Sequence, residues 1–105
     1  MYFKKKSNII YRDYNTFGYI TDNRNFGYTQ LNDNENYIGD KILSQSGSVF
    51  FKNLTSKPQH LDILAKKIQS QFENIDIDTI KNDAKEFYLS LESDGFVISG
   101  LTIKE

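Results

Sequence analysis

Aromatic residues are distributed unevenly along this chain, and their distribution limits the folds open to it. Eight of the fifteen Phe and Tyr residues fall within the first 28 positions. Aromatic and β-branched side chains favour strands. The later part of the chain instead places its apolar residues at helical spacing. The sequence therefore predicts an α+β fold, with an N-terminal sheet followed by helices.

The predicted sheet is small and antiparallel and has three or four strands. Asn and Asp residues at 22–25 favour a hairpin, because both residue types tolerate positive φ and bond their own backbone. Phe-Gly-Tyr occurs on both arms of this hairpin, and we expect its glycines, Gly18 and Gly27, to permit strand twist or the close approach of an aromatic neighbour. The predicted strands are 8–13, 17–21, 26–31 and a short fourth at 40–43.

Three helices are predicted after the sheet. The first covers 47–54, with Ser44 or Ser46 as its N-cap. The second covers 61–72, where apolar residues at 61, 64, 68 and 72 form one face. The third begins after Asp78 as N-cap and ends at Gly95 in the left-handed conformation. Its predicted core stripe consists of Ile80, Ala84, Phe87 and Leu91.

A short closing strand is predicted at 96–98. No linker rich in Gly, Ser or Pro divides the chain, so residues 1–105 are interpreted as one domain. A small sheet beside three short helices is a winged-helix-like α+β arrangement.

Composition argues against several classes of function. Thirteen basic and fourteen acidic residues leave a net charge of −1, whereas a general nucleic-acid or membrane-surface binder needs a basic excess. The chain has no cysteine and one histidine, which excludes disulfides, thiolate metal sites and iron–sulfur ligation. No activated nucleophile or acid–base pair is visible, so the chain is interpreted as a non-enzyme without a cofactor.

Targeting signals are also missing from the sequence pattern. The apolar runs fall far short of the roughly 20 residues that a membrane span requires. The Met-Tyr-Phe-Lys-Lys-Lys start is followed by Ser-Asn and not by the apolar stretch of a secretory signal. We therefore expect a cytoplasmic location and no membrane contact.

Three polar features have ordinary structural interpretations. His60 is expected to lie at the surface or to cap a helix. The lysines at 4–6 are expected to form a solvated terminus. The acids at 76, 78, 83 and 86 lack the Gly and the closing Glu of a calcium loop, and the helix macrodipole accounts for acids at a helix start.

The small sheet itself indicates a function. A sheet of three or four strands leaves an edge, and an edge beside an amphipathic helix forms a groove that accepts an added peptide strand. The alternative is an edge that the 32–39 loop covers. Sequence alone leaves both open.

The order of four segments resembles the PqqD-like family, also called RiPP recognition elements. The similarity covers roughly residues 8–99. It runs through the 26–31 strand, the Ser-Gly-Ser-Val-Phe-Phe helix start at 46–51, the Pro-Gln-His-Leu-Asp-Ile-Leu segment at 58–64 and the ending at 83–97, which includes Leu91 and Gly95. His60 stands where the family commonly has Thr or Ser, and the 32–43 segment is longer than usual.

This resemblance implies a non-catalytic chaperone that binds the leader region of a ribosomally synthesised precursor peptide as an extra strand. The domain would then present the precursor to a modifying enzyme, such as a radical SAM maturase, as a separate protein or as that enzyme's N-terminal domain. Transferred to this chain, the groove would lie between the 26–31 strand and a second stripe of the last helix. The implied peptide-binding residues are Phe26, Tyr28, Thr29, Gln30, Leu31, Lys81, Lys85, Tyr88 and Glu92.

Two other interpretations stay open. The alternative is a winged-helix nucleic-acid-binding or transcription-regulatory domain, which the chain's two arginines and its net charge make the weaker one. An exposed edge strand can also pair with its own copy, so a homodimer is possible.

Overall fold

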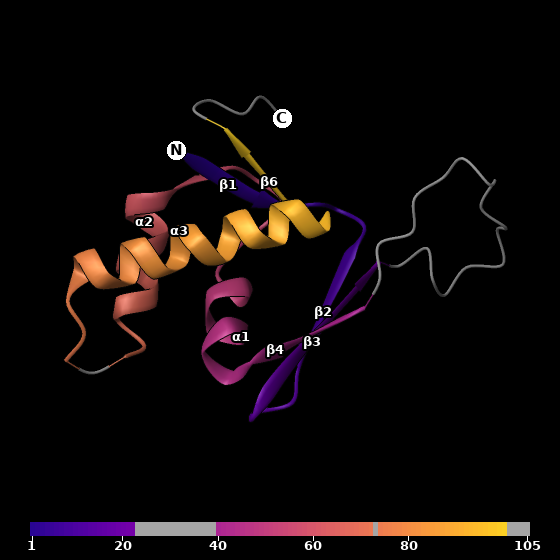
Figure 1. Ribbon diagram of the computed structural model, residues 1–105, viewed down its shortest axis with the longest axis horizontal. Helices are drawn as coiled ribbons and strands as arrows, with labels where there is room; N and C mark the ends of the chain where they lie inside the picture. Colours follow the sequence, from indigo (N-terminus) through magenta and orange to yellow (C-terminus); the bar gives the residue numbers. More distant parts are fainter. Residues whose placement is uncertain (23–39, 73, 101–105) are drawn as a thin grey trace, which may run out of the picture.

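Two antiparallel sheets of three strands and three helices form the described part of the chain, residues 1–22, 40–72 and 74–100, in a computed structural model (Figure 1). The expected α+β class is confirmed. The elements are β1 (Tyr2–Lys5), β2 (Ile9–Asp13), β3 (Phe17–Asp22), β4 (Lys41–Ser44), α1 (Gln45–Lys52), β5 (Gln59–His60), α2 (Leu61–Gln69), α3 (Ile77–Asp94) and β6 (Val97–Gly100). Within these residues, no helix combines the length and apolarity needed to cross a membrane.

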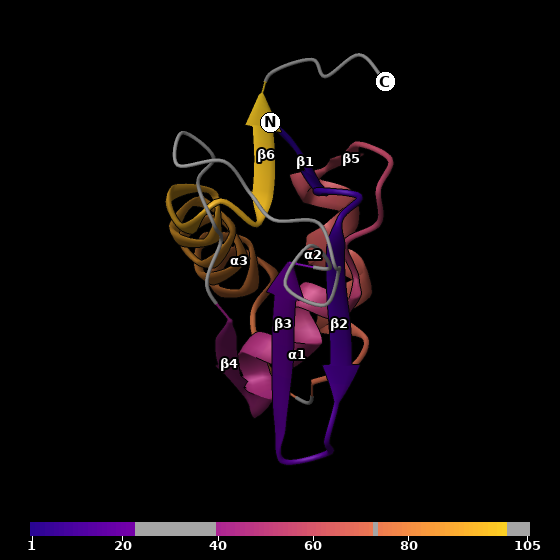
Figure 2. The same ribbon diagram turned by 90° about the vertical axis from the view of Figure 1, so that its right-hand side faces the viewer.

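The first sheet has the strand order β2-β3-β4. Its register pairs Tyr11 with Ile20 across β2 and β3, and Ile20 with Lys41 across β3 and β4. The short strand expected at 40–43 is therefore confirmed as β4. The third strand expected at 26–31 lies outside the described residues. Both edge strands are visible in Figure 2, where β4 lies on the side of α3.

The second sheet, with the order β5-β1-β6, was not predicted from the sequence. The interpretation of the N-terminus as a solvated tail is wrong, because β1 is the central strand of this sheet. Side chains alternate along a strand, so β1 can direct Phe3 into the core while Lys4 stays partly exposed. The closing strand expected at 96–98 is confirmed as β6, which pairs with β1 along its length.

One hydrophobic core joins the two sheets and the three helices. It contains side chains from every helix and from both sheets, among them Phe3, Ile20, Phe51, Leu64 and Leu91. Burial of apolar surface at roughly 25 cal/mol per Å² is the main favourable term in such a fold. The core therefore fixes how α3 lies relative to both sheets.

Side-chain caps begin the first two helices. Ser44 Oγ accepts a hydrogen bond of 3.1 Å from the Gly47 N–H at the start of α1. His60 Nδ1 accepts one of 3.1 Å from the Asp62 N–H at the start of α2. Of the alternatives that the sequence left open, the structure selects Ser44 over Ser46 and gives His60 the capping role. Each bond satisfies a donor that the helix itself leaves unpaired.

The third helix starts earlier than expected. Its N-cap is Asp76, whose side chain makes no capping bond, so the assignment of Asp78 as N-cap is wrong. Asp78 lies in the first turn, where its charge complements the helix dipole. Gly95, with φ of 94°, ends the helix as predicted, and its N–H donates 3.0 Å to the Glu92 carbonyl.

The core stripe of α3 includes Tyr88 and not Phe87. Tyr88 is fully buried, and its hydroxyl donates a 2.7 Å hydrogen bond to the Phe50 carbonyl. Burial also raises the pKa of Tyr88. Phe87 is only partly buried and packs against Phe50, with ring centroids 5.5 Å apart. The expected stripe is therefore wrong at this one position.

Gly18 allows α1 to pack closely on β3. A Cβ atom at this position would come within 2.5 Å of Ser48 Oγ and 3.1 Å of the Tyr11 ring. The aromatic neighbour of Gly18 in the described structure is Tyr11 of β2, whereas the other arm of the predicted hairpin, 26–31, lies outside the described residues. Gly18→Ala is expected to lower the free energy of unfolding by about 1–3 kcal/mol, because the helix must move away. Urea denaturation followed by circular dichroism checks this, and an unchanged midpoint would contradict it.

Candidate functional site: the edge of β4 and the α1–α3 pocket

The outer edge of β4 has no strand partner among the described residues. At the β2–β3 turn, the Tyr14 N–H donates 2.9 Å to the Phe17 carbonyl, which makes this a hydrogen-bonded pair. Hydrogen-bonded and non-hydrogen-bonded pairs alternate along an antiparallel ladder. By this alternation, the main-chain groups of Lys41 and Leu43 face β3. Those of Ile42 consequently face outward.

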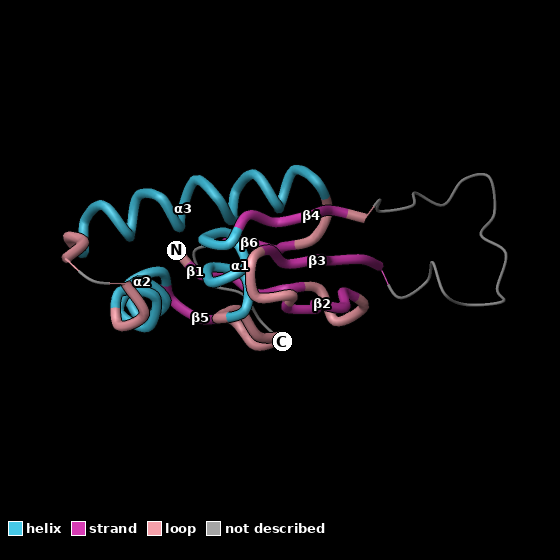
Figure 3. Tube along the Cα trace, turned by 90° about the horizontal axis from the view of Figure 1, so that it is seen from below, coloured by secondary structure: helices cyan, strands magenta, loops and turns pink. Residues whose placement is uncertain are grey.

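Helix α3 runs beside this edge. The view from below places the C-terminal half of α3 next to β4, and in the face-on view of the sheet α3 lies above β4 on the same side (Figures 3 and 2). The Lys41 ammonium donates to the Asp94 carboxylate, which joins the start of β4 to the last turn of α3. Together with Asp40 and Phe96, these two residues line a hollow of about 290 Å³. The ion pair therefore forms one end of the boundary between β4 and α3.

A larger pocket, here called the α1–α3 pocket, lies at the other end of this boundary and has a volume of about 500 Å³. Phe50, Phe72 and Phe87 supply aromatic walls, and Ile75 and Ile80 supply aliphatic ones. The ring of Phe50 meets those of Phe72 and Phe87 edge to face, at centroid distances of 6.2 and 5.5 Å. Such walls suit an apolar side chain.

Gly47 shapes this pocket. A Cβ atom at Gly47 would lie 3.0 Å from the Phe87 ring, so the glycine lets that ring rest on the first turn of α1. Ser46 and Ser90 also line the pocket. Ser46 follows the end of β4 by two residues, and Ser90 precedes Asp94 by one helical turn. The edge of β4 that is unpaired among the described residues thus leads toward the pocket.

The charged residues that line the α1–α3 pocket are both acidic. Asp83 and Glu86 are exposed and lie on the side of α3 that borders the pocket. Neither forms an ion pair with another residue of the described part. Asp40 and Asp94 add acidic groups at the far end of the boundary, where Lys41 is paired with Asp94. The electrostatic character of the site is therefore negative.

The side chains expected to bind a peptide are not gathered at this pocket. Phe26, Tyr28, Thr29, Gln30 and Leu31 lie outside the described residues. The other four lie on α3, on the side away from the pocket or in the core. Tyr88 is buried, so the expectation that it lines a groove is corrected. These four positions are Lys81, Lys85, Tyr88 and Glu92.

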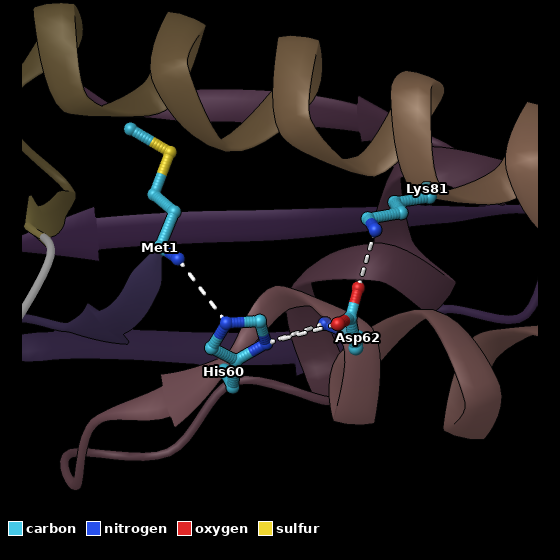
Figure 4. A network of polar contacts seen from close by, with 4 residues as sticks. All are labelled: Met1, His60, Asp62 and Lys81. Carbon is cyan, nitrogen blue, oxygen red and sulfur yellow. Dashed lines mark hydrogen bonds and ion pairs between the residues drawn. The ribbon is translucent and has the colours of Figure 1, made fainter.

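Lys81 faces α2, as Figure 4 shows. Its ammonium lies 2.6 Å from Asp62 Oδ1. This hydrogen bond lowers the pKa of Asp62 and raises that of Lys81. Asp62 also lies beside His60, whose Nε2 is 3.3 Å from the main-chain nitrogen of Met1 (Figure 4). Lys81 therefore has a structural partner on the opposite side of the helix from Asp83.

Glu92 has a structural partner too. Its Oε2 accepts hydrogen bonds of 2.7 and 2.6 Å from the main-chain N–H and the hydroxyl of Ser99. This contact ties α3 to β6. Lys85 is exposed on the same side of the helix as Lys81. The stripe 81/85/88/92 therefore faces α2, the core and β6, and not β4.

Sequence reasoning missed the residues that line the α1–α3 pocket. Phe87 was assigned to the core, and Asp83 and Glu86 were compared with a calcium loop and then interpreted as helix-start acids. The available signal was the spacing of positions 83, 87, 90 and 94, which follow one side of a helix. Within the described ranges, no group of three or more His, Asp or Glu side chains could hold a metal ion.

Comparison with known proteins finds a similar fold but no similar sequence. No family model and no curated protein matches the sequence. Among solved structures, TbiB1 in complex with the TbiA(beta) leader peptide is similar, with a TM-score of 0.66. The alignment covers 94% of this chain and 99% of that one, at 11% sequence identity. The two chains share a fold.

Proposed function

We propose that the protein binds the leader region of a ribosomally synthesised precursor peptide and performs no chemistry on it. The peptide pairs as an extra strand with β4, beside α3. The observation that carries this proposal is the outward-facing N–H and C=O of Ile42, which have no strand partner in the described structure and lie on an edge that leads to an apolar pocket. The fold shared with leader-bound TbiB1 and the PqqD-like sequence pattern support it.

The docking strand of this proposal differs from the one expected from the sequence. The segment 26–31 lies outside the described residues, whereas β4 is a described edge with α3 beside it. A peptide at β4 would have one side toward α3 and would continue past Ser44 into the α1–α3 pocket. Strand addition of this kind gives affinity through main-chain bonds and specificity through pockets.

Affinity at this edge depends mainly on the pocket. β4 has four residues, and by the ladder alternation Ile42 is the interior residue that presents both main-chain groups outward. One or two main-chain hydrogen bonds contribute about 0.5–1.5 kcal/mol each. A peptide that is disordered when free also loses conformational entropy on binding. We therefore expect moderate affinity, with most of it coming from apolar side chains.

The modification itself is assigned to a partner enzyme. The sequence resemblance favours a peptide-modifying enzyme such as a radical SAM maturase, to which this protein would present the bound precursor. This division of labour applies whether the chain acts alone or as part of that enzyme.

Titration of ¹⁵N-labelled protein with the leader halves of precursor peptides from the same genome tests the proposal. We expect one peptide to shift amide resonances in β4, in the first turn of α1 and along the 83–94 side of α3. Duplex DNA serves as the parallel ligand. No response to any peptide, together with DNA-induced shifts in α2, would contradict the proposal and favour the nucleic-acid-binding alternative.

A further inference from the structure

The lysines of α3 and the acids that line the α1–α3 pocket lie on different sides of the helix: Lys81 and Lys85 on one, Asp83 and Glu86 on the other. At 3.6 residues per turn, positions 83, 87, 90 and 94 lie roughly opposite 81, 85 and 92. The cations of the second side do not line the α1–α3 pocket, and Lys81 is held by Asp62. Lys41 is likewise held by Asp94 at the far end of the boundary. A peptide at β4 therefore meets the acids Asp83 and Glu86 without a described neighbouring cation that offsets them.

The pocket beside these acids accepts an apolar group. Its volume of about 500 Å³ exceeds that of a single side chain, and the rings of Phe50, Phe72 and Phe87 supply edges and faces for aromatic contacts. Asp83 and Glu86 lie on the same turn of α3 as Phe87. A residue next to the one that fills the pocket is therefore within reach of both carboxylates.

We infer that the bound peptide segment is cationic, with an apolar side chain in the α1–α3 pocket and a neighbouring Lys or Arg at Asp83 and Glu86. This inference rests on the proposed function and names the class of peptide that the site selects. It assigns charge selection to Asp83 and Glu86 and not to Lys81 and Lys85, the two cations among the peptide-binding residues that the resemblance implies. This assignment follows from which side of α3 borders β4.

The ion pairs and the apolar side chain contribute unequally to the affinity of the peptide. Exposed ion pairs change affinity by at most about fivefold each. Like charges brought together weaken binding further, and charges at the rim of an interface act strongly on association and partner choice. The apolar anchor therefore supplies most of the affinity, while Asp83 and Glu86 discriminate against acidic peptides.

Selection from an mRNA-displayed library of random peptides tests the inference without a known ligand. The library is selected in parallel against the wild-type protein and against a variant carrying Asp83→Lys and Glu86→Lys. Wild type should enrich peptides in which an apolar residue stands beside Lys or Arg at a fixed position. The variant should enrich Asp or Glu at that same position.

Individual peptides from the selection, made synthetically, allow the change in affinity to be measured. Fluorescence polarisation should show that Glu86→Lys weakens the selected peptide about fivefold and that added salt reduces this difference. The matched control is Asp78→Lys, which makes the same charge change on the other side of α3 and should leave affinity unchanged. If the reversed variants do not fold, Lys→Glu in the peptide, measured on wild-type protein, replaces them and should weaken binding similarly.

The outcomes separate this inference from the proposed function. Enriched peptides that lose affinity on Ile42→Pro but show no preference for Lys or Arg would overturn the inference and leave strand addition intact. Equal weakening by Glu86→Lys and Asp78→Lys would also overturn it, since net charge would then explain the effect. If neither protein enriches peptides above an unrelated control protein, the proposed function fails and the inference fails with it.

Discussion

Replacing Tyr88 with alanine is expected to lower the free energy of unfolding by about 3–5 kcal/mol, the usual cost of removing a large buried aromatic ring. Tyr88 is fully buried, its ring lies 5.1 Å from that of Phe3, and it contacts Phe87 as well. Truncation would leave a cavity between α3 and β1. Small domains have only about 5–15 kcal/mol of stability, so a large part of it would be lost. Urea denaturation followed by circular dichroism measures the change.

Two control variants separate the contributions of the ring and the hydroxyl. Tyr88→Phe keeps the ring but leaves the Phe50 carbonyl without its donor, and we expect a loss of about 1 kcal/mol. Tyr14→Ala removes a tyrosine that is 48% exposed and should change stability much less. A larger loss for Phe87→Ala than for Tyr88→Ala would contradict the structure and restore the core stripe expected from the sequence.

The choice between Phe87 and Tyr88 shows where helical periodicity stops being informative. Both positions follow Ala84 at a spacing that keeps them on one face, so either aromatic can complete the stripe. Hydrophobicity alone favours Phe87. The structure buries Tyr88, and its hydroxyl can be buried without an unpaired polar group because it has a main-chain acceptor at Phe50, which is 38 residues away in the sequence. A long-range partner of this kind cannot be deduced from the spacing of residues within one helix.

Local signals predicted the elements that depend on local chemistry. The end of α3 at Gly95 and the cap by Ser44 were correct, because each requires only neighbouring residues. The strand β1 was missed because the lysines at 4–6, two of which lie within it, indicated a solvated tail. Its strand character comes from pairing with β6, in which Tyr2 lies opposite Gly100. Pairing across almost the whole chain leaves no local pattern to detect.

The residues that line the α1–α3 pocket are not the ones that the sequence resemblance implied for a peptide-binding groove. The sequence left open an exposed edge strand beside an amphipathic helix or an edge covered by the 32–39 loop, and among the described residues β4 is an edge strand with α3 beside it. A helix has two sides flanking its core stripe, however, and the sequence does not say which of them borders the sheet. The ion pair between Lys41 and Asp94 places β4 along the side that carries Asp83 and Phe87. For that reason the charged residues beside the pocket are Asp83 and Glu86, and not Lys81 and Lys85.

Ile42→Pro is expected to weaken peptide binding by about tenfold or more while the protein still folds. The substitution removes the outward-facing N–H of β4, and the ring leaves no donor for an added strand. The loss of one main-chain hydrogen bond, together with the displacement of the peptide's other main-chain bonds to β4, accounts for an effect of this size. The β3 ladder keeps its bonds, because those come from Lys41 and Leu43, and proline is tolerated on edge strands. Isothermal titration calorimetry with a selected peptide measures the loss.

Two matched variants make this test specific to the backbone. Ile42→Ala keeps the N–H and removes a side chain that is 70% exposed, so both stability and binding should change little. Leu43→Pro removes a donor that faces β3 and distorts a buried position, so it should unfold the sheet instead. Wild-type affinity in a folded Ile42→Pro protein would exclude β4 as the docking strand. Thr29→Pro would then test the 26–31 segment. If a peptide pairs with that segment, removing the main-chain N–H of residue 29 should abolish binding while the protein stays folded.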